Sequence, residues 1–208
     1  MNSALKTRII QALFNPFERI AGGPSFLLGL LSFVLASWIG ARKNIHFDGV
    51  LDMHVGPPFP LWLFIGEGIV SWLCMCVCLW IAGKAISRTS FRALDLCGTQ
   101  ALARWPTVIT AIISLLPGFH RFTDQLVLAI QADPLSPRIT FATGDALAFL
   151  AVTIVMLLGT VWMVALMWKS FALCCNVRGT KAVLSFTVSL ILAEVLSKVL
   201  IAQLPSLL

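Results

Sequence analysis

Two histidines and two aspartates lie close together in the segment IHFDGVLDMH. They form the pattern H-x-D-x3-D-x-H and are His46, Asp48, Asp52 and His54. Imidazole nitrogens and carboxylate oxygens are suitable ligands for zinc and other divalent metals. The spacing matches no standard zinc motif, however, and the Asp-Gly dipeptide inside the segment is an ordinary turn sequence. The segment therefore has two interpretations, a divalent metal site and a hydrogen-bonded turn, of which the turn is favoured.

Four ionisable residues lie within long apolar stretches and are Glu67, Arg104, Glu194 and Lys198. A charge inside a bilayer is costly, so each of them needs a partner or a function. Glu194 and Lys198 are four residues apart, which places them on one helix face in the favourable order for an ion pair. Glu67 is expected at a similar depth, so these three residues can form one buried cluster between two helices.

This intramembrane cluster also has two interpretations. As a functional group it would relay protons or ions, or form a polar floor for a ligand. As a structural group it would hydrogen-bond two helices together, with the Lys198 side chain extending outward. The structural interpretation is favoured. For Arg104, anchoring to lipid phosphate or to free helix carbonyls is favoured over catalysis.

These residues need helices to position them. Residues 146–168, ALAFLAVTIVMLLGTVWMVALMW, are 23 residues with no charge and no proline. At 1.5 Å per residue they form about 35 Å of helix, which is enough to cross a hydrocarbon core about 30 Å thick. The stretch is apolar all round, as is typical of a helix in lipid. It predicts a transmembrane span.

Five such spans predict an all-α polytopic membrane helix bundle within one domain, residues 24–208. The expected spans are 24–41, 60–86, 98–118, 146–168 and 182–204. Pro106 predicts a kink near Arg104, because proline removes a backbone donor.

Two further segments are expected to lie at the membrane surface. Residues 1–23 contain apolar positions at helical spacing and predict an amphipathic surface helix that Pro16 bends or interrupts; the alternative is a frayed tail. The sequence FTDQLVLAIQA, residues 122–132, is too short to cross and predicts a short surface helix between spans three and four.

The composition agrees with a membrane protein. Hydrophobic residues make up 59% of the 208 residues and charged residues 12%, about half the charged share of a soluble domain. The net charge of +6 does not indicate nucleic-acid binding, because the basic residues form short clusters beside apolar runs. Such clusters are typical of topology signals and of contacts with lipid headgroups.

The basic residues also predict the orientation. With the N-terminus inside, nine lysines and arginines fall in inner segments and four in outer loops, which favours an inner N-terminus and an outer C-terminus. The six cysteines then lie in the inner half, where thiols remain reduced and packing is their expected role. His120 and Asp124 fall on the outer side with the other histidines.

Several motifs are typical of a known family. They are NPFERIAGGP before the first span, FDGVLDMH and PFPLW before the second, GTQALARWP in the third, and MWK followed by NVRGTKAV before the fifth. In these motifs and in its five spans the chain resembles the Yip domain family of Ypt/Rab-interacting membrane proteins. Eukaryotic members act in vesicle traffic with small GTPases through a sizeable cytosolic N-terminal region. Only about twenty residues precede the first span here, so the resemblance is to the prokaryotic members and implies the bacterial cytoplasmic (inner) membrane. It implies no catalytic residue and no cofactor.

No nucleophile–base pair, phosphate-binding glycine loop or nucleotide motif is present in the sequence. We therefore expect a non-enzymatic membrane scaffold or partner-binding protein of the Yip type, whose partners are membrane lipids and a protein or a second copy, with no nucleic acid. The alternative is a small transporter or channel that uses Glu67, Glu194 and Lys198. The third interpretation is a metal-dependent membrane protein built on the outer histidines and aspartates.

Overall fold

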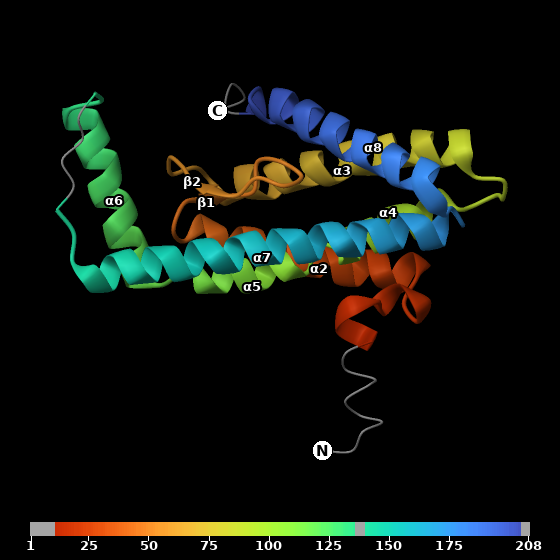
Figure 1. Cartoon of the computed structure of the whole chain (residues 1–208), viewed down its shortest axis with the longest axis horizontal. Helices are drawn as coiled ribbons and strands as arrows, with labels where there is room; N and C mark the ends of the chain where they lie inside the picture. The colour runs from red at the N-terminus through yellow and green to blue at the C-terminus, as the bar shows by residue number, and fades with distance from the viewer. Residues whose placement is uncertain (1–10, 136–139, 205–208) are drawn as a thin grey trace, which may run out of the picture.

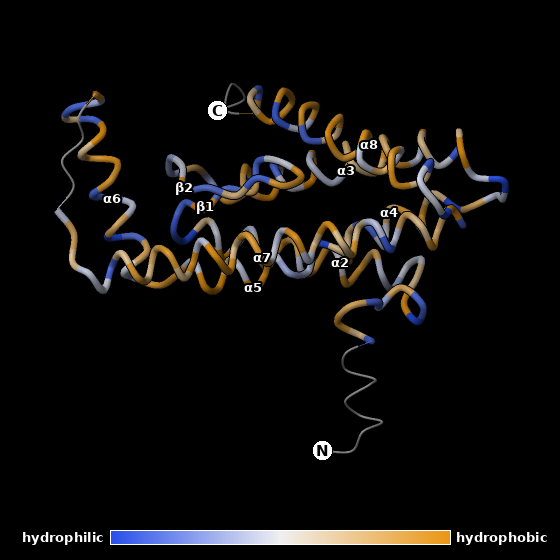
Figure 2. The backbone as a smooth tube through the Cα atoms, viewed as in Figure 1, coloured by the Kyte–Doolittle hydropathy of each residue, from blue (hydrophilic) through white to orange (hydrophobic). Residues whose placement is uncertain are grey.

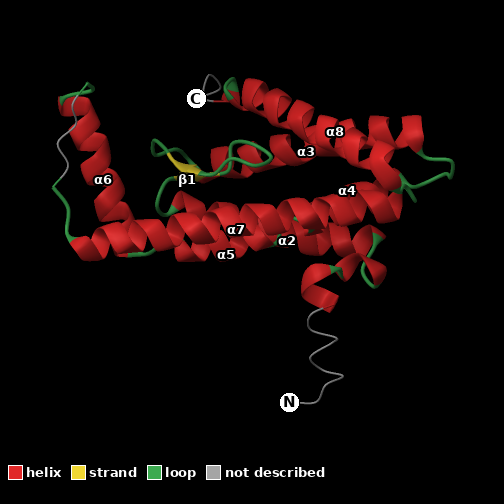
Figure 3. Cartoon of the chain, viewed as in Figure 1, coloured by secondary structure: helices red, strands yellow, loops and turns green. Residues whose placement is uncertain are grey.

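Seven α-helices account for most of residues 11–135 and 140–204, the parts of the chain that the computed structural model describes (Figures 1 and 3). They are α2 (Gly22–Ala41), α3 (Leu61–Ile86), α4 (Ala93–Leu102), α5 (Pro106–Ile113), α6 (Pro117–Ala132), α7 (Thr143–Cys174) and α8 (Gly179–Ile201). A short 3-10 helix, η1 (Pro16–Glu18), precedes them, and two strands, β1 (Ile45–His46) and β2 (His54–Val55), form a small hairpin.

The prediction of an all-helical membrane bundle is confirmed at this level. Within the described residues, α2, α3, α7 and α8 are each long and apolar enough to cross a membrane. The segment from Ala93 to Ile113 and the following α6 qualify only as a pair, bent by 81°. The described part of the chain therefore has four candidate spans, or five if this bent pair counts as one. The tube in Figure 2 is mainly apolar along the helices, and its hydrophilic residues gather in the connections at the two ends.

Most helix bounds differ from the predicted spans by a few residues. Helix α3 agrees with 60–86 within one residue, whereas α7 begins three residues before 146 and ends six after 168. The extension of α7 includes Asp145 and Lys169, which the sequence analysis placed outside the span. Both have partners: the Arg121 Nη2 atom lies 2.6 Å from Asp145 Oδ1, and Lys169 Nζ donates to the Phe14 carbonyl at 2.8 Å. Charged residues with such partners do not end a helix.

The predicted kink near Arg104 is confirmed. Helix α4 ends at Leu102 and α5 begins at Pro106, with residues 103–105 forming a turn between them. Proline has no N–H group to continue the α4 hydrogen-bond pattern, but it is well suited to the first turn of a helix. Arg104 therefore lies in a short turn between two helices and not within a continuous helix.

Helix α6 includes the helix predicted at 122–132 but is longer. It begins five residues earlier, at Pro117, and stands at a steep angle to the other helices (Figure 1). Its base packs on α7, where the Phe119 ring stacks on Phe149 with centroids 5.7 Å apart. The proline at its first turn, which the sequence analysis counted with the third span, explains the earlier start.

Of the predicted amphipathic segment 1–23, residues 1–10 lie outside the described part of the chain. Residues 11–14 are helical and η1 follows after a break at Asn15, so the predicted interruption near Pro16 is present. Phe17 is buried, with 3% exposure, and Phe14 stacks on Trp162 of α7 with centroids 5.2 Å apart. This part of the segment therefore packs against the bundle.

Small residues allow the closest helix contacts. A Cβ atom on Gly29 of α2 would lie 2.5 Å from backbone atoms of Ala101 and Leu102 in α4. Such contact is possible only without a side chain, and small residues at interfaces are typical of packing between membrane helices. The approach of α2 to α4 brings the α4–α5 turn into the centre of the bundle.

Candidate functional site

A narrow cavity lies inside the bundle between α2, α3, the α4–α5 turn, α5, α7 and the loop of residues 47–53. It contains about 510 Å³ of empty space, including its mouth, but only about 30 Å³ can hold the centre of a water molecule. The cavity is therefore small, but it is large enough to hold water or a small polar ligand. Its walls are mainly apolar and include Phe33, Val50 and Met163.

Arg104 is the buried charge of this cavity. The residue is 4% exposed, and its Nη1 atom donates to Ser71 Oγ at 2.9 Å. Its Nε and Nη2 atoms have no hydrogen-bond partner in the described part of the chain. None of the ion pairs found there includes Arg104, although Glu194 attracts it from a distance. A guanidinium group stays charged, so the cavity contains a full positive charge with two unused donors.

The other polar groups of the cavity are weaker. The hydroxyls of Thr107, Thr110 and Thr160 each donate to a backbone carbonyl three or four residues earlier in the chain, at 2.7–3.0 Å. They remain able to accept a hydrogen bond but give no charge. The one acidic residue of the lining, Asp52, is 37% exposed and has its own cation. Inside the cavity, Arg104 is therefore the dominant electrostatic feature.

The loop of residues 47–53 joins β1 to β2, which pair antiparallel in the register Ile45 with Val55 and His46 with His54. Helix α8 holds this loop in place. The Leu51 amide donates to Glu194 Oε2 at 2.9 Å, and Lys198 forms an ion pair with Asp52 and lies 3.7 Å from Glu194 Oε1. The predicted Glu194–Lys198 pair is therefore present, and both side chains bind the loop that covers the cavity.

Glu67 has a different partner from the one predicted. Its Oε1 atom lies 2.8 Å from His46 Nδ1, and the other ring nitrogen of His46 lies 2.9 Å from the Pro57 carbonyl oxygen. Glu67 and Lys198 thus hold the hairpin through separate contacts, and the predicted three-residue cluster is two separate groups. Equal depth in the membrane did not determine the partner, because a loop residue lies beside Glu67.

His46 is best satisfied as an imidazolium ion. Both of its nitrogens face acceptors, and the Pro57 carbonyl can only accept, so two N–H donors fit the site. Burial lowers the pKa of His46, but the hydrogen bonds to Glu67 and Pro57 outweigh it, and the pKa is raised overall.

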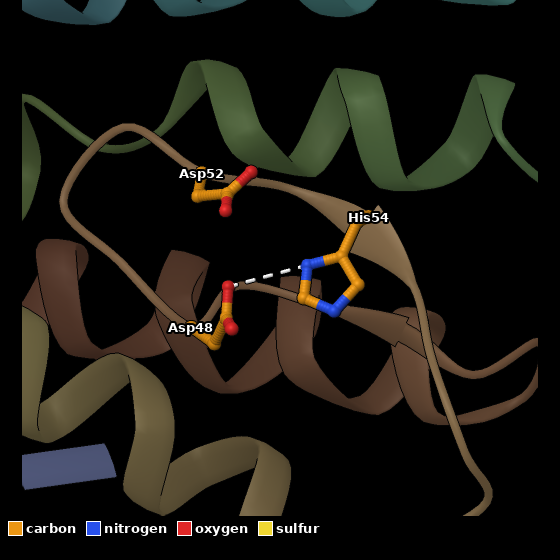
Figure 4. A group of neighbouring side chains, drawn as sticks. All are labelled: Asp48, Asp52 and His54. Atoms are coloured by element: carbon orange, nitrogen blue, oxygen red, sulfur yellow. Dashed lines mark ion pairs between the residues drawn. The ribbon is translucent and has the colours of Figure 1, made fainter. Parts of the chain in front are cut away.

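Both ring nitrogens of His46, the first residue of the predicted metal site, face hydrogen-bond acceptors. The remaining residues, Asp48, Asp52 and His54, each offer a ligand atom within 4.8 Å of the others (Figure 4). His54 Nδ1 lies 3.3 Å from Asp48 Oδ1, while Asp52 pairs with Lys198. Ion pairs explain this exposed group without a metal, and the metal site remains a prediction. His120 and Asp124 lie on α6 and are not part of the group.

Several partners of the buried polar residues were not predicted from the sequence. Ser71 is the hydrogen-bond partner of Arg104, and Gln100 of α4 donates to the Met167 carbonyl and to Ser170 Oγ of α7 at 2.9 and 3.0 Å. The available signal was the presence of serine and glutamine within apolar spans, where such groups hydrogen-bond between helices.

The fold and the cavity define a helical protein of the multi-pass membrane type, with a buried cation inside its bundle. Comparisons with family models, with curated proteins and with solved structures give no match. The resemblance to the Yip family therefore remains a prediction from the motifs.

Proposed function

We propose that this protein binds a small monovalent anion inside the membrane bundle, as a carrier or channel of the transporter class. The observation that carries the proposal is Arg104, a buried guanidinium with no carboxylate partner and two unused donors at a cavity. An unpaired charge is costly in a low-dielectric interior, and an anion beside it offsets much of that cost. The proposal modifies the transporter alternative, because Arg104 takes the place of Glu67, Glu194 and Lys198.

The size of the cavity limits the ligand. The small space open to water-sized groups favours a small anion, such as chloride or formate. Planar carboxylates can also accept both Nε–H and Nη2–H in a bidentate arrangement. Formate is therefore expected to bind more tightly than chloride.

Binding can be tested by thermal unfolding in detergent, with gluconate as the large reference anion. Formate should raise the melting temperature of the wild type, since a ligand at 100 times its Kd stabilises by about 2.7 kcal/mol. Arg104→Gln should abolish this shift, whereas the matched control Arg42→Gln, at an exposed residue after α2, should retain it. Equal shifts in wild type and Arg104→Gln would refute the anion site.

Transport needs a second measurement. Liposomes that contain the wild type should release chloride or formate faster than empty liposomes, and those with Arg104→Gln should not. Release no faster than from empty vesicles, together with an intact binding shift, would reject the carrier or channel role and retain the binding site.

A second candidate is the scaffold or partner-binding role expected from the sequence. Helix α7 supports it, because it has the smallest buried share of the four long apolar helices. Its exposed side chains include Leu157 and Leu158, at 65% and 62% exposure. Lipid can also cover this face. Co-purification of a defined protein in fixed proportion, lost on changing Leu157 and Leu158 to alanine, would favour the scaffold role.

A further inference from the structure

A second group of unpaired cations lies where the α3–α4 loop meets the α7–α8 turn. Arg88, Arg178 and Lys181 line one shallow pocket with about 540 Å³ of space open to water. All three residues are exposed, and no acidic residue lines the pocket. None of the three side chains forms a hydrogen bond or an ion pair with another described residue.

Three like charges around one pocket repel each other, and an anion between them would replace that repulsion with attraction. The start of α8 adds to the effect. Helix α8 begins at Gly179, and its N-cap residue Arg178 makes no side-chain capping bond, so the first N–H groups of this helix are not capped by that side chain. The N-terminus of a helix favours negative charge.

The walls of the pocket are held together before any ligand binds. Ser87 Oγ donates to the Cys175 carbonyl at 2.7 Å and accepts from the Thr89 amide at 3.2 Å, which ties the α3–α4 loop to the end of α7. Thr89 and Asn176 add polar groups to the lining. Little reorganisation is therefore needed to place the cations around one ligand.

The surroundings favour a lipid over a free ion. Ile86 and Ala182 form part of the same pocket. Beyond it, Ile81 of α3 and Leu184 of α8 are apolar and 58% and 60% exposed. A phospholipid with its phosphate in the pocket could thus place its acyl chains along the apolar outer surfaces of α3 and α8.

We propose that this pocket binds the phosphate headgroup of an anionic phospholipid. Basic pockets between membrane helices at the cytoplasmic surface bind such headgroups in general. The proposal is independent of the Arg104 cavity, which lies inside the bundle and has a different lining.

The test compares two charge-matched double variants in phosphatidylcholine nanodiscs doped with phosphatidylglycerol. The variant Arg178→Gln/Lys181→Gln removes two cations of the pocket, and Arg42→Gln/Lys43→Gln removes two exposed cations after α2. The pocket variant should lose about 30-fold in affinity for phosphatidylglycerol, the effect of two basic residues near an anionic surface. The control should retain wild-type affinity.

Three outcomes would overturn the proposal. A loss of equal size in both variants would mean that overall charge attracts the lipid. Wild-type affinity in the pocket variant would mean that the lipid binds elsewhere. If millimolar inorganic phosphate displaces phosphatidylglycerol completely, the pocket binds phosphate without regard to the lipid. Equal melting temperatures of all three proteins in pure phosphatidylcholine show that the exposed substitutions leave the fold intact.

Discussion

The two histidines of the hairpin, His46 and His54, each pair with a carboxylate, but the two pairs have different surroundings. His46 and Glu67 are each 3% exposed at the side chain, and their atoms are 2.8 Å apart. The His54 and Asp48 side chains are 45% and 25% exposed, with 3.3 Å between the paired atoms. Solvent screens the second pair, so it contributes about 0–1 kcal/mol to the free energy of unfolding. Removal of one partner from a buried pair lowers that free energy by about 3–5 kcal/mol. His46 is therefore the main anchor of the hairpin.

We predict that His46→Gln lowers the melting temperature and flattens its dependence on pH. Because the pKa of His46 is raised in the folded state, its stabilising effect is present below the unfolded pKa, about 6.5, and is lost as pH rises through the folded pKa. The wild type should thus be more stable at pH 5.5 than at pH 8.5, and His46→Gln should lose most of this difference.

The matched control is His54→Gln. The pKa of His54 is raised by its hydrogen bond to Asp48, which outweighs burial, so its contribution has the same sign. Because it is exposed, its effect on the melting temperature should be several times smaller. Scanning calorimetry at the two pH values measures both effects, and equal effects of the two variants would show that burial does not set the strength of the pair.

At the residue scale, the sequence identified which residues are unusual but not their partners. Glu67, Arg104, Glu194 and Lys198 were identified because charge is rare within apolar spans. The partner of Glu67 was assigned by depth, and depth does not specify the direction in which a side chain points around its helix. His46 was assigned to a metal site because its neighbours in sequence are also potential ligands.

At the scale of elements, the break between α4 and α5 explains why a charged residue lies inside the bundle. Pro106 ends the hydrogen-bond pattern of α4, and residues 103–105 form a turn there. The close contact of α2 with α4 then positions this turn beside α3, where Ser71 Oγ accepts a hydrogen bond from the Arg104 guanidinium. The proline makes the break predictable, but the cavity depends on how six segments pack, which no local pattern specifies.

The contact of α2 with α4 predicts a large effect of Gly29→Ala. The new Cβ atom would lie 2.5 Å from the Ala101 backbone, which cannot move away as a flexible side chain can. Overpacking of this kind costs about 1–3 kcal/mol. Gly23→Ala is the matched control, because nothing lies within 4 Å of its Cβ position.

Thermal unfolding in detergent measures both variants. Gly29→Ala should unfold several degrees below the wild type, while Gly23→Ala should unfold at or above the wild-type temperature, since alanine has the higher helix propensity. A Gly29→Ala protein as stable as the wild type would contradict the close packing of α2 on α4.

At the scale of the whole molecule, the membrane class followed from hydropathy because lipid requires about 20 apolar residues in each crossing helix. The long helices α3, α7 and α8 were located for this reason. The segment from Ala93 to Ala132 was harder, because its three helices are separated by two breaks and none of them is long enough alone. Whether the chain crosses four or five times depends on this segment.

The packing of α4 and α5 predicts that the chain crosses the membrane five times. Helix α4 lies along α2, and α5 continues along α2 and α7 toward the end of the bundle that holds the β1–β2 hairpin (Figure 1). Together they extend from one end of the bundle to the other, so they should cross the membrane and make five spans. An odd number of spans puts the two termini on opposite sides.

Epitope tags at the two ends of the full chain test this topology in sealed membrane vesicles from cells that express the protein. An external protease should remove one tag and leave the other until detergent opens the vesicle. If the N-terminus lies inside the cell, as the basic residues predict, inverted vesicles should expose the N-terminal tag. The basic residue in the last turn of α3, Lys84, agrees with this orientation, because this end of α3 lies at the same end of the bundle as η1 (Figure 1). Simultaneous loss of both tags would mean four spans, with α4 and α5 entering and leaving on one side, and Arg104 would then lie in a re-entrant segment.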